Sequence, residues 1–366
     1  MKRGLLKQKL ERKAPSTVGL LDELLIYNST LVTKGGNDAT AIRNDWSKPF
    51  LTFTAAKAAA QDGDTICVFS GTYDEKNIGR SNITINAIGR VIVEYTGSDD
   101  GALIDDTATG TNAKIENMRV IGDIQLIRSG TGNEISLKGC VYLLNGSDLL
   151  LDGVRIKGDG YATPVLAGTN FLSTGATITI RNAIIENTGD PATTNGTVTA
   201  GYGGTITCYN CNISKASGAP VYTNNNASAK IYLYQCNVTA NDSAVAILYS
   251  NRGLIEAHDC YLLNNESNGI GIYLETSDSK ILLRSSTTYV PNESTFSIGI
   301  YTESSTTLIL DSATVLASAS GYCIFTGGAV DIYLYSLYRN KAHNEGAGAV
   351  TDIVGGLDIL SVNVIP

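Results

Sequence analysis

The chain has 366 residues and a formal net charge of -8, and only 17% of its residues are charged. The negative charge disfavours non-specific binding to nucleic acid, and no apolar run approaches the roughly 18–20 residues of a membrane span. We therefore expect no nucleic-acid partner and no membrane span. The 38 Gly and 19 Tyr, with many Thr, Ser and Asn, favour numerous short strands joined by tight turns.

The first 13 residues, MKRGLLKQKLERK, are strongly basic. This segment is either a solvated, frayed terminus or an arm that docks on a partner. Its apolar residues are too interrupted for a secretory signal peptide, so we expect no export signal. The candidate docking residues are Lys2, Arg3, Lys7, Lys9, Arg12 and Lys13.

Residues 48–75, KPFLTFTAAKAAAQDGDTICVFSGTYDE, predict a short helix followed by a strand. Thr52 is a suitable N-cap, and Gly63 is expected to end the helix. The strand begins at Asp64, and Gly71-Thr-Tyr is expected to turn the chain after it.

Four segments between residues 82 and 158 share a strand-like pattern: NITINAIGRVIVEY, AKIENMRVIGD, NEISLKGCVYL and DLLLDGVRIKG. The 14-residue step from Ile135 to Leu149 is too short for a full repeat of the kind that follows. Either one segment is a second strand within a repeat or the chain makes a local excursion, and both interpretations stay open.

From about residue 175 the chain repeats with a period near 25 residues. The apolar anchors are Ile178, Ile206, Ile231, Ile255, Ile281, Leu308 and Ile332, at steps of 28, 25, 24, 26, 27 and 24 residues. A second inward position recurs at Val221, Ile247, Ile272, Ile300 and Ile324, followed by polar turns. Such a period indicates a solenoid, and the lack of a 3.6-residue pattern excludes helical repeats. We therefore predict an all-β fold, a right-handed parallel β-helix.

Four of the seven cysteines follow this period. A stacked interior ladder explains them better than a zinc site, because zinc ligands converge in a tetrahedron rather than forming a line. We expect no disulfide framework, no metal and no cofactor. The predicted columns are Cys211, Cys236, Cys260, Ser286 and Ala313, and Cys208 with Leu233, Ala257, Leu283 and Leu310.

The start of the repeats resembles the pectin-lyase-like superfamily of right-handed β-helix proteins. The matching residues are Pro49-Phe50-Leu51-Thr52, Gly63-Asp64-Thr65-Ile66 and Gly71-Thr72-Tyr73-Asp74-Glu75. In that arrangement a short N-terminal helix covers the open end of the solenoid with Phe53, Ala56 and Ala60. The resemblance concerns the fold and says little about chemistry.

Residues 31–50, LVTKGGNDATAIRNDWSKPF, are similar to the lead-in of tail-spike and tail-fibre-like proteins of tailed bacteriophages. This resemblance implies a homotrimer with parallel coils and contacts with other virion proteins. It also implies four regions: a virion-attachment arm at 1–46, a capping helix at 47–63, the β-helix at 64–340 and a closing segment at 341–366.

Two outward acids, Glu275 and Glu303, are candidates for polysaccharide hydrolysis. Each lies three residues after its anchor, Ile272 or Ile300, and the flanking coils place Ser250 and Gly327 there. Equivalent residues of adjacent coils lie about 4.8 Å apart, close to the carboxylate spacing of about 5–5.5 Å in retaining glycosidases. The alternative is two solvated acids at a turn.

The only acidic cluster with a histidine is Glu256-Ala-His258-Asp259. Alternation places Glu256 and His258 outward on one face, where they are either a general acid/base pair or an ordinary solvated strand face. The calcium-dependent lyases of the resembling family also need clustered acids in register, and we find no matching set of Asp residues.

Outward aromatic residues recur from coil to coil. Tyr222, Tyr273, Tyr301 and Phe325 directly follow inward anchors, with Leu248 filling the gap, and Tyr209 and Tyr234 stack on the earlier strand beside Tyr232. Exposed contiguous aromatics mark interfaces. The candidates are a subunit contact in a trimer, a glycan-binding face, and cover by the chain's own loops.

The leading hypothesis is a non-enzymatic structural or receptor-binding appendage of a bacteriophage virion, assembled in the host cytoplasm. Its expected partners are two further copies, tail, baseplate or capsid proteins, and host surface polysaccharide. The alternative is a polysaccharide depolymerase, a glycoside hydrolase or lyase. A weaker alternative is a bacterial surface adhesin.

Overall fold

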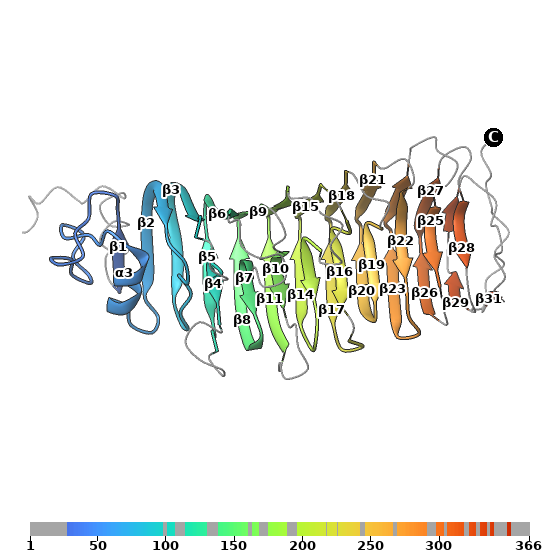
Figure 1. Cartoon of the computed structure of the whole chain (residues 1–366), viewed down its shortest axis with the longest axis horizontal. Coiled ribbons are helices and arrows are strands. Elements are labelled where there is room, and N and C mark those ends of the chain that lie inside the picture. Colours follow the sequence, from blue (N-terminus) through green and yellow to red (C-terminus); the bar gives the residue numbers. More distant parts are fainter. Residues whose placement is uncertain are drawn as a thin grey trace, which may run out of the picture.

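The computed structural model describes residues 28–352 apart from sixteen gaps, and beyond Leu316 it describes the backbone only. The gaps are 98–100, 107–113, 130–137, 160–162, 168–174, 189–195, 217, 225, 242–245, 266–268, 291–297, 304–305, 318–321, 327–329, 335–336 and 340–349. The basic segment at 1–13 lies outside the described residues, as do residues 353–366. The described chain winds into an elongated parallel β-solenoid (Figure 1), which confirms the predicted fold class.

Three columns of parallel strands form the walls of the solenoid, and each coil contributes one strand to each column in turn. Column I contains β5 (Met118–Ile121), β8 (Asn145–Asp152), β11 (Gly175–Arg181), β14 (Thr205–Tyr209), β17 (Lys230–Tyr234), β20 (Gly253–His258), β23 (Ser279–Arg284), β26 (Thr306–Asp311), β29 (Val330–Leu334) and β31 (Val350–Asp352). Column II contains β6 (Ile124–Ser129), β9 (Arg155–Asp159), β12 (Ile184–Asn187), β15 (Asn212–Lys215), β18 (Asn237–Ala240), β21 (Tyr261–Asn264), β24 (Thr287–Val290), β27 (Ala313–Ala317) and β30 (Leu337–Arg339). Column III contains β4 (Ile104–Asp105), β7 (Lys138–Leu143), β10 (Thr163–Ala167), β13 (Val198–Ala200), β16 (Val221–Asn224), β19 (Leu248–Asn251), β22 (Ile270–Leu274), β25 (Ile298–Thr302) and β28 (Tyr322–Thr326).

The first coils are built from longer strands. β2 (Thr65–Asp74) pairs along its length with β3 (Thr84–Tyr95), and β3 pairs with both β5 and β6, so it spans columns I and II. β2 spans both columns as well, because residues 65–69 pair with 84–88 and residues 71–74 pair with 91–94. The turn expected at Gly71 corresponds to this corner between columns I and II, which appears as a shift of register between Phe69 and Gly71 while the strand continues to Asp74.

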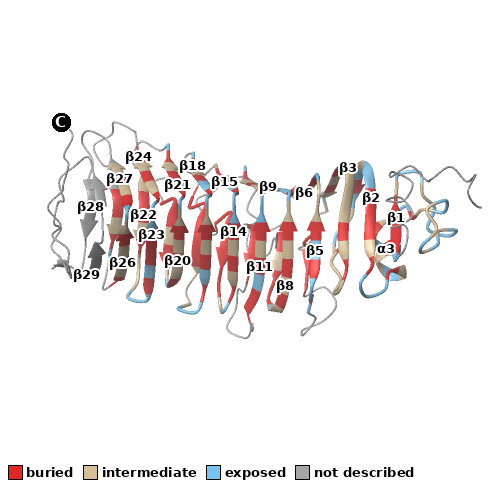
Figure 2. Ribbon diagram, turned by 180° about the vertical axis from the view of Figure 1, so that it is seen from behind, coloured by how far each residue is buried: buried red, intermediate tan, exposed pale blue. Residues whose placement is uncertain are grey.

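The predicted inward columns are confirmed in column I. Ile178, Ile206, Ile231, Ile255, Ile281, Leu308 and Ile332 pair from coil to coil, as do Cys208, Leu233, Ala257, Leu283 and Leu310. Every one of these side chains that the structure describes is buried. Alternation of buried and more exposed residues along each strand gives the banded pattern of Figure 2.

The corner between columns I and II explains the cysteine ladder. Each corner has one residue with φ between 46° and 55°, and the next residue is buried: Asn182, Asn210, Gln235, Asp259, Ser285 and Ser312 precede Ala183, Cys211, Cys236, Cys260, Ser286 and Ala313. The backbone NH of Cys236 donates to Sγ of Cys260 over 3.4 Å, and the NH of Cys260 donates to Oγ of Ser286 over 3.1 Å. The predicted ladder is therefore confirmed, and the free thiols among the described residues are all buried.

The register of column III differs from the prediction at one coil. Val221 pairs with Leu248, and Leu248 with Ile272, so Leu248 takes the inward position that was predicted for Ile247. Because a one-residue shift exchanges the two faces of a strand, Tyr249 rather than Leu248 takes the outward position between Tyr222 and Tyr273.

The open question about residues 113–158 is also resolved. Met118–Ile121 pairs with residues 149–152 in column I, while Lys138–Leu143 lies in column III. Residues 138–143 of the segment NEISLKGCVYL thus form a further strand within the coil, as the first interpretation expected, while Ile135 lies outside the described residues.

A short helix, α3 (Phe53–Ala59), covers the N-terminal end of the solenoid. Thr52 is its N-cap, with its side chain accepting a hydrogen bond from the NH of Ala55, and Phe53, Ala56 and Ala60 are buried as predicted. The helix is shorter than predicted: Ala60 is the C-cap, and Gly63, at φ 87°, lies in the turn that leads to β2.

Part of the predicted N-terminal arm belongs to the solenoid. β1 (Ser29–Val32) pairs in parallel with β2. Residues 44–50 cover its other side, where the NH of Phe50 donates to the carbonyl of Leu31 over 2.7 Å. This cover protects the first strand edge from pairing with another chain. At the other end, β31 from the predicted closing segment pairs with β29.

Candidate functional site

The motif residues near the N-terminal end hold the cap in place. Arg43 contacts Asp64 through two hydrogen bonds, Nε to Oδ2 at 2.5 Å and Nη2 to Oδ1 at 2.6 Å. The carboxylate of Glu75 accepts hydrogen bonds from the NH groups of Phe53 and Thr54 at 2.7 and 2.9 Å, so it caps the start of α3 from outside the helix. The Asp and Glu of the Gly-Asp and Gly-Thr-Tyr-x-Glu motifs therefore have structural partners.

The outward residues of column III form a tyrosine ladder, defined here as Tyr222, Tyr249, Tyr273 and Tyr301. Neighbouring ring centroids lie 5.0, 4.8 and 5.2 Å apart. Tyr222 is buried, with 2% of its surface exposed, while the other three are half-buried. Phe325 continues the backbone register after Tyr301, and its side chain lies outside the described residues.

Two of the ladder hydroxyls, those of Tyr249 and Tyr273, reach the neighbouring coil, whereas Oη of Tyr222 donates to Oδ1 of Asn224 in its own strand over 3.3 Å. Oη of Tyr249 donates to Oε2 of Glu275 over 2.7 Å. Burial and the hydrogen bond to this negative carboxylate raise the pKa of Tyr249, and burial with a hydrogen bond to Glu303 raises the pKa of Tyr273. Each phenol thus stays protonated at neutral pH and stabilises a carboxylate one coil further along.

The two candidate acids lie in one column, as predicted. Glu275 and Glu303 directly follow Leu274 and Thr302, which pair across β22 and β25. Ser250 pairs with Leu274, so Asn251 and not Ser250 precedes Glu275 in this column; Gly327 lies outside the described residues. The described geometry places phenol donors on both carboxylates, which favours the interpretation of a side-chain ladder over a hydrolytic pair.

The second outward ladder lies on column I. Tyr209 and Tyr234 stack at 5.0 Å with an interplanar angle of 11°, and His258 stacks on Tyr234 at 4.9 Å. Arg181 lies over the ring of Tyr209 at 5.6 Å, and at the other end Arg284 contacts Asp311 at 3.7 Å. The predicted stacking of Tyr209 on Tyr234 is confirmed. His258 belongs to the same stack, which the sequence analysis did not recognise.

His258 and Glu256 face each other as predicted, with Nε2 3.3 Å from Oε2. Asp259 lies at the corner, with φ 53°. Because one face of the imidazole is covered by Tyr234, this ring is held in a stack rather than placed over an open cleft. Tyr232 lies beside the ladder and pairs with Glu256 across β17 and β20.

The ring orientation limits what these ladders can bind. The rings of the column I ladder are nearly parallel, at 11° and 23°, whereas the tyrosine ladder is tilted by 42° and 40° at its first two contacts and by 20° at the third. In both ladders each ring lies about 5 Å from the next along the solenoid, so the face between two neighbours is covered and mainly edges and polar tips point to solvent. Sugars stack on aromatic faces, whereas edges offer hydrogen-bonding groups instead. Tyr209, with 39% of its surface exposed, is the most accessible of the described side chains in the two ladders.

A hollow that the sequence analysis missed lies on the outward face of the first coils. A cavity of about 470 Å³ is lined by Asp62, Gly63, Asn82, Ile83, Thr84, Asn117 and Arg119. A neighbouring cavity of about 210 Å³ shares Asn117 and Arg119 and extends to Asp148, Thr177 and Thr179. The lining is mixed, because hydroxyl, amide and charged groups alternate with Ile83, Met118, Leu149 and Leu150. The signal was the repeated Asn at the turn before the column I strands, where Asn117 donates to Asn82 over 3.1 Å.

Two further predictions concern metals and membranes. Within the described ranges, no three His, Cys, Asp or Glu side chains converge as metal ligands would. In the same part of the chain, no helix has the length and hydrophobicity of a membrane span.

The parallel coils, the buried ladders and the capped N-terminal end define a β-solenoid. The family described as "Right handed beta helix region" matches residues 100–288, which is just over half of the chain. The chain belongs to this right-handed β-helix family. No curated protein and no solved structure matches it.

Proposed function

We propose that the protein is a non-enzymatic structural or receptor-binding appendage of a bacteriophage virion, similar to a tail spike or tail fibre. The observation that carries the non-enzymatic part is the 2.7 Å hydrogen bond between Tyr249 and Glu275. A catalytic carboxyl group must be able to hydrogen-bond to the substrate or to the attacking water. The carboxylate of Glu275 instead accepts a hydrogen bond from Tyr249 of the adjacent coil.

The architecture supports a mechanical role. Each inner strand pairs with one coil before it and one after it, and outward Asn, Tyr and His side chains add contacts in the same direction. A rod of this kind transmits position from one end to the other without a hinge. The phage context rests on the similarity of residues 31–50 to virion appendages, and the homotrimer rests on the same resemblance.

A second candidate is a depolymerase of host surface polysaccharide. The hollow around Arg119 and Asp148 favours contact with a hydroxyl-rich ligand. Contact alone does not make an enzyme, so activity must be measured.

The test is incubation of the full chain with host capsule or cell-wall glycan, followed by assays for reducing ends and unsaturated sugars. The proposal expects no release beyond a heat-denatured control. Release that Glu275→Gln or Glu303→Gln abolished, with folding retained, would replace the structural role with the depolymerase.

A further inference from the structure

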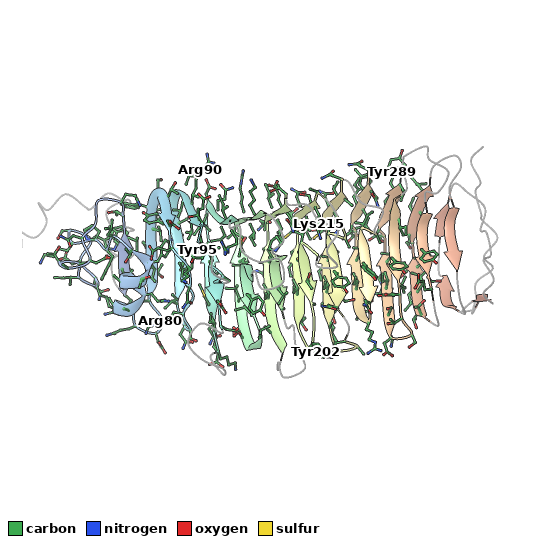
Figure 3. The ribbon with its side chains drawn as sticks, viewed as in Figure 1. Arg80, Arg90, Tyr95, Tyr202, Lys215 and Tyr289 are labelled. Atoms are coloured by element: carbon green, nitrogen blue, oxygen red, sulfur yellow. The ribbon has the colours of Figure 1, made fainter. Side chains whose placement is uncertain are left out.

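The outward face of column II carries a long uncharged strip. Strands β15, β18, β21, β24 and β27 each direct two side chains outward, in two rows that stay in register from coil to coil. The strip consists of Asn212, Ser214, Asn237, Thr239, Tyr261, Leu263, Thr287, Tyr289, Thr314 and Leu316. These strands run along the upper edge of the rod in Figure 1, and Tyr289 lies at that edge in Figure 3.

The other two faces of the same coils are charged. Outward positions of column I include Lys230, Glu256, Lys280, Arg284 and Asp311, and Glu275 and Glu303 follow the column III strands. Column II itself is charged before the strip begins, at Arg155, Lys157 and Glu186. The lack of charge is therefore specific to this strip.

The strip also has the composition of an interface. Tyr261 is 41% exposed, and Leu263, Tyr289 and Leu316 are half-buried on the solvent side of the sheet. Aromatic and aliphatic side chains without charges are typical of interface cores. At its polar end, Nδ2 of Asn237 donates to Oδ1 of Asn212 over 3.0 Å, so these amides partly satisfy each other before any partner arrives.

We propose that this strip is a contact surface between copies of the chain. Each copy carries a net charge of -8, so copies repel one another in general. The strip is a face on which two such copies meet without burying ions, whose desolvation is costly. It is also straight and parallel to the rod, about 20 Å long for four steps of about 4.8 Å, so a parallel copy presents the same repeat.

This inference takes only the number of copies, three, from the proposed function. What it adds is the face of the solenoid through which the copies contact one another. It places the contact on column II and not on the tyrosine ladder, whose rings contact one another and in which Tyr249 and Tyr273 bond to acids of the next coil. A strip of this length is shorter than a standard interface, so we expect association that depends on concentration.

The experiment is sedimentation velocity of the full chain over a wide concentration range, with variants that place a charge on the strip. Leu263→Glu is expected to weaken association at least tenfold. The matched control is Leu254→Glu, because Leu254 is an equally half-buried leucine on the outward face of column I, between Lys230 and Lys280. It should associate like the native protein. Circular dichroism and melting confirm that both variants fold.

Tyr261→Lys serves as the second variant if Leu263→Glu does not fold, because its side chain is already largely exposed. A native chain that stays monomeric at every concentration would overturn the inference. A native oligomer that neither variant weakens would also overturn it, while leaving the trimer of the proposed function in place. A monomer that binds neutral polysaccharide through the strip would assign the surface to a glycan and equally overturn the inference.

Discussion

Arg43 and Asp64 form a two-fold hydrogen-bonded ion pair across 21 residues of sequence, and the side chain of Asp64 is 1% exposed. Asp64 also accepts a hydrogen bond from the NH of Gln61 at 2.8 Å. The pair therefore ties the segment before α3 to the turn after it, at the end where the solenoid would otherwise expose its interior.

Asp64→Asn should destabilise the protein by about 2–3 kcal/mol at neutral pH, because Arg43 then lacks its buried partner. Burial opposes the charge on Asp64, but the hydrogen bonds from Arg43 and Gln61 outweigh it and lower its pKa below 3.8. The contribution to stability is thus complete above pH 3.8 and is lost as the pH falls through the lowered folded value. Urea unfolding of both proteins from neutral to acid pH measures this. Equal stability at neutral pH would contradict the role of the pair.

Glu75→Ala should cost about 1–2 kcal/mol, since it removes the acceptor for two NH groups at the start of α3. Asp74→Ala is the matched control, because Asp74 is an exposed neighbour at the end of β2. Thermal unfolding should separate the two variants. If both melt alike, Glu75 is not the cap that the geometry indicates.

Tyr249→Phe should cost about 1 kcal/mol, because it removes the hydroxyl donor to Glu275. The raised pKa of Tyr249 means that this contribution is complete below pH 10.0 and is lost as the pH rises through the higher folded value. Tyr261→Phe, which removes an exposed hydroxyl, should be near neutral. Spectrophotometric titration of phenols adds a second readout: Glu275→Gln should let Tyr249 ionise at lower pH, with smaller shifts in the same direction for Tyr222 and Tyr273. An unchanged titration curve would argue against the ladder.

The buried thiols should resist modification in the folded protein. Burial raises the pKa of Cys67 to about 11 and that of Cys140 to about 12, and thiolates rather than thiols react with alkylating reagents. Labelling with iodoacetamide and peptide mapping should therefore find Cys67 and Cys140 unmodified until the chain is unfolded. Burial alone should protect Cys208, Cys211, Cys236 and Cys260 in the same way. Rapid native labelling at Cys211, Cys236 or Cys260 would contradict their position in the interior.

The corner position restricts residue type. Asn210 has φ 52° and donates to Asn182 over 3.0 Å. Asn210→Val should cost about 1–3 kcal/mol, because β-branched residues rarely adopt this conformation. Asn212→Val, two residues later in a regular strand, should be tolerated. Similar melting temperatures for the two valine variants would show that the corner is not strained.

The inward columns were predictable because apolar and polar residues alternate along each strand. In β14, for example, the apolar Ile206 and Cys208 alternate with Thr205, Thr207 and Tyr209. Ile247 and Leu248 are both apolar, so alternation alone did not decide between them, and aligning Tyr249 with Tyr222 and Tyr273 would have done so. The Arg43–Asp64 pair was not predictable, because Arg43 lies in a segment without repeats and its partner is distant in sequence. The corner residues did carry a periodic signal, at Asn182 and Asn210, which the apolar pattern obscured.

The central claim is that the chain is part of a virion, and mass spectrometry of purified phage particles from an infected host tests it most directly. The account predicts peptides of this chain in intact particles. It also predicts that the number of copies per particle, calibrated against the tail or capsid proteins, is a multiple of three. Particles that contain all their other structural proteins but no peptide of this chain would contradict it.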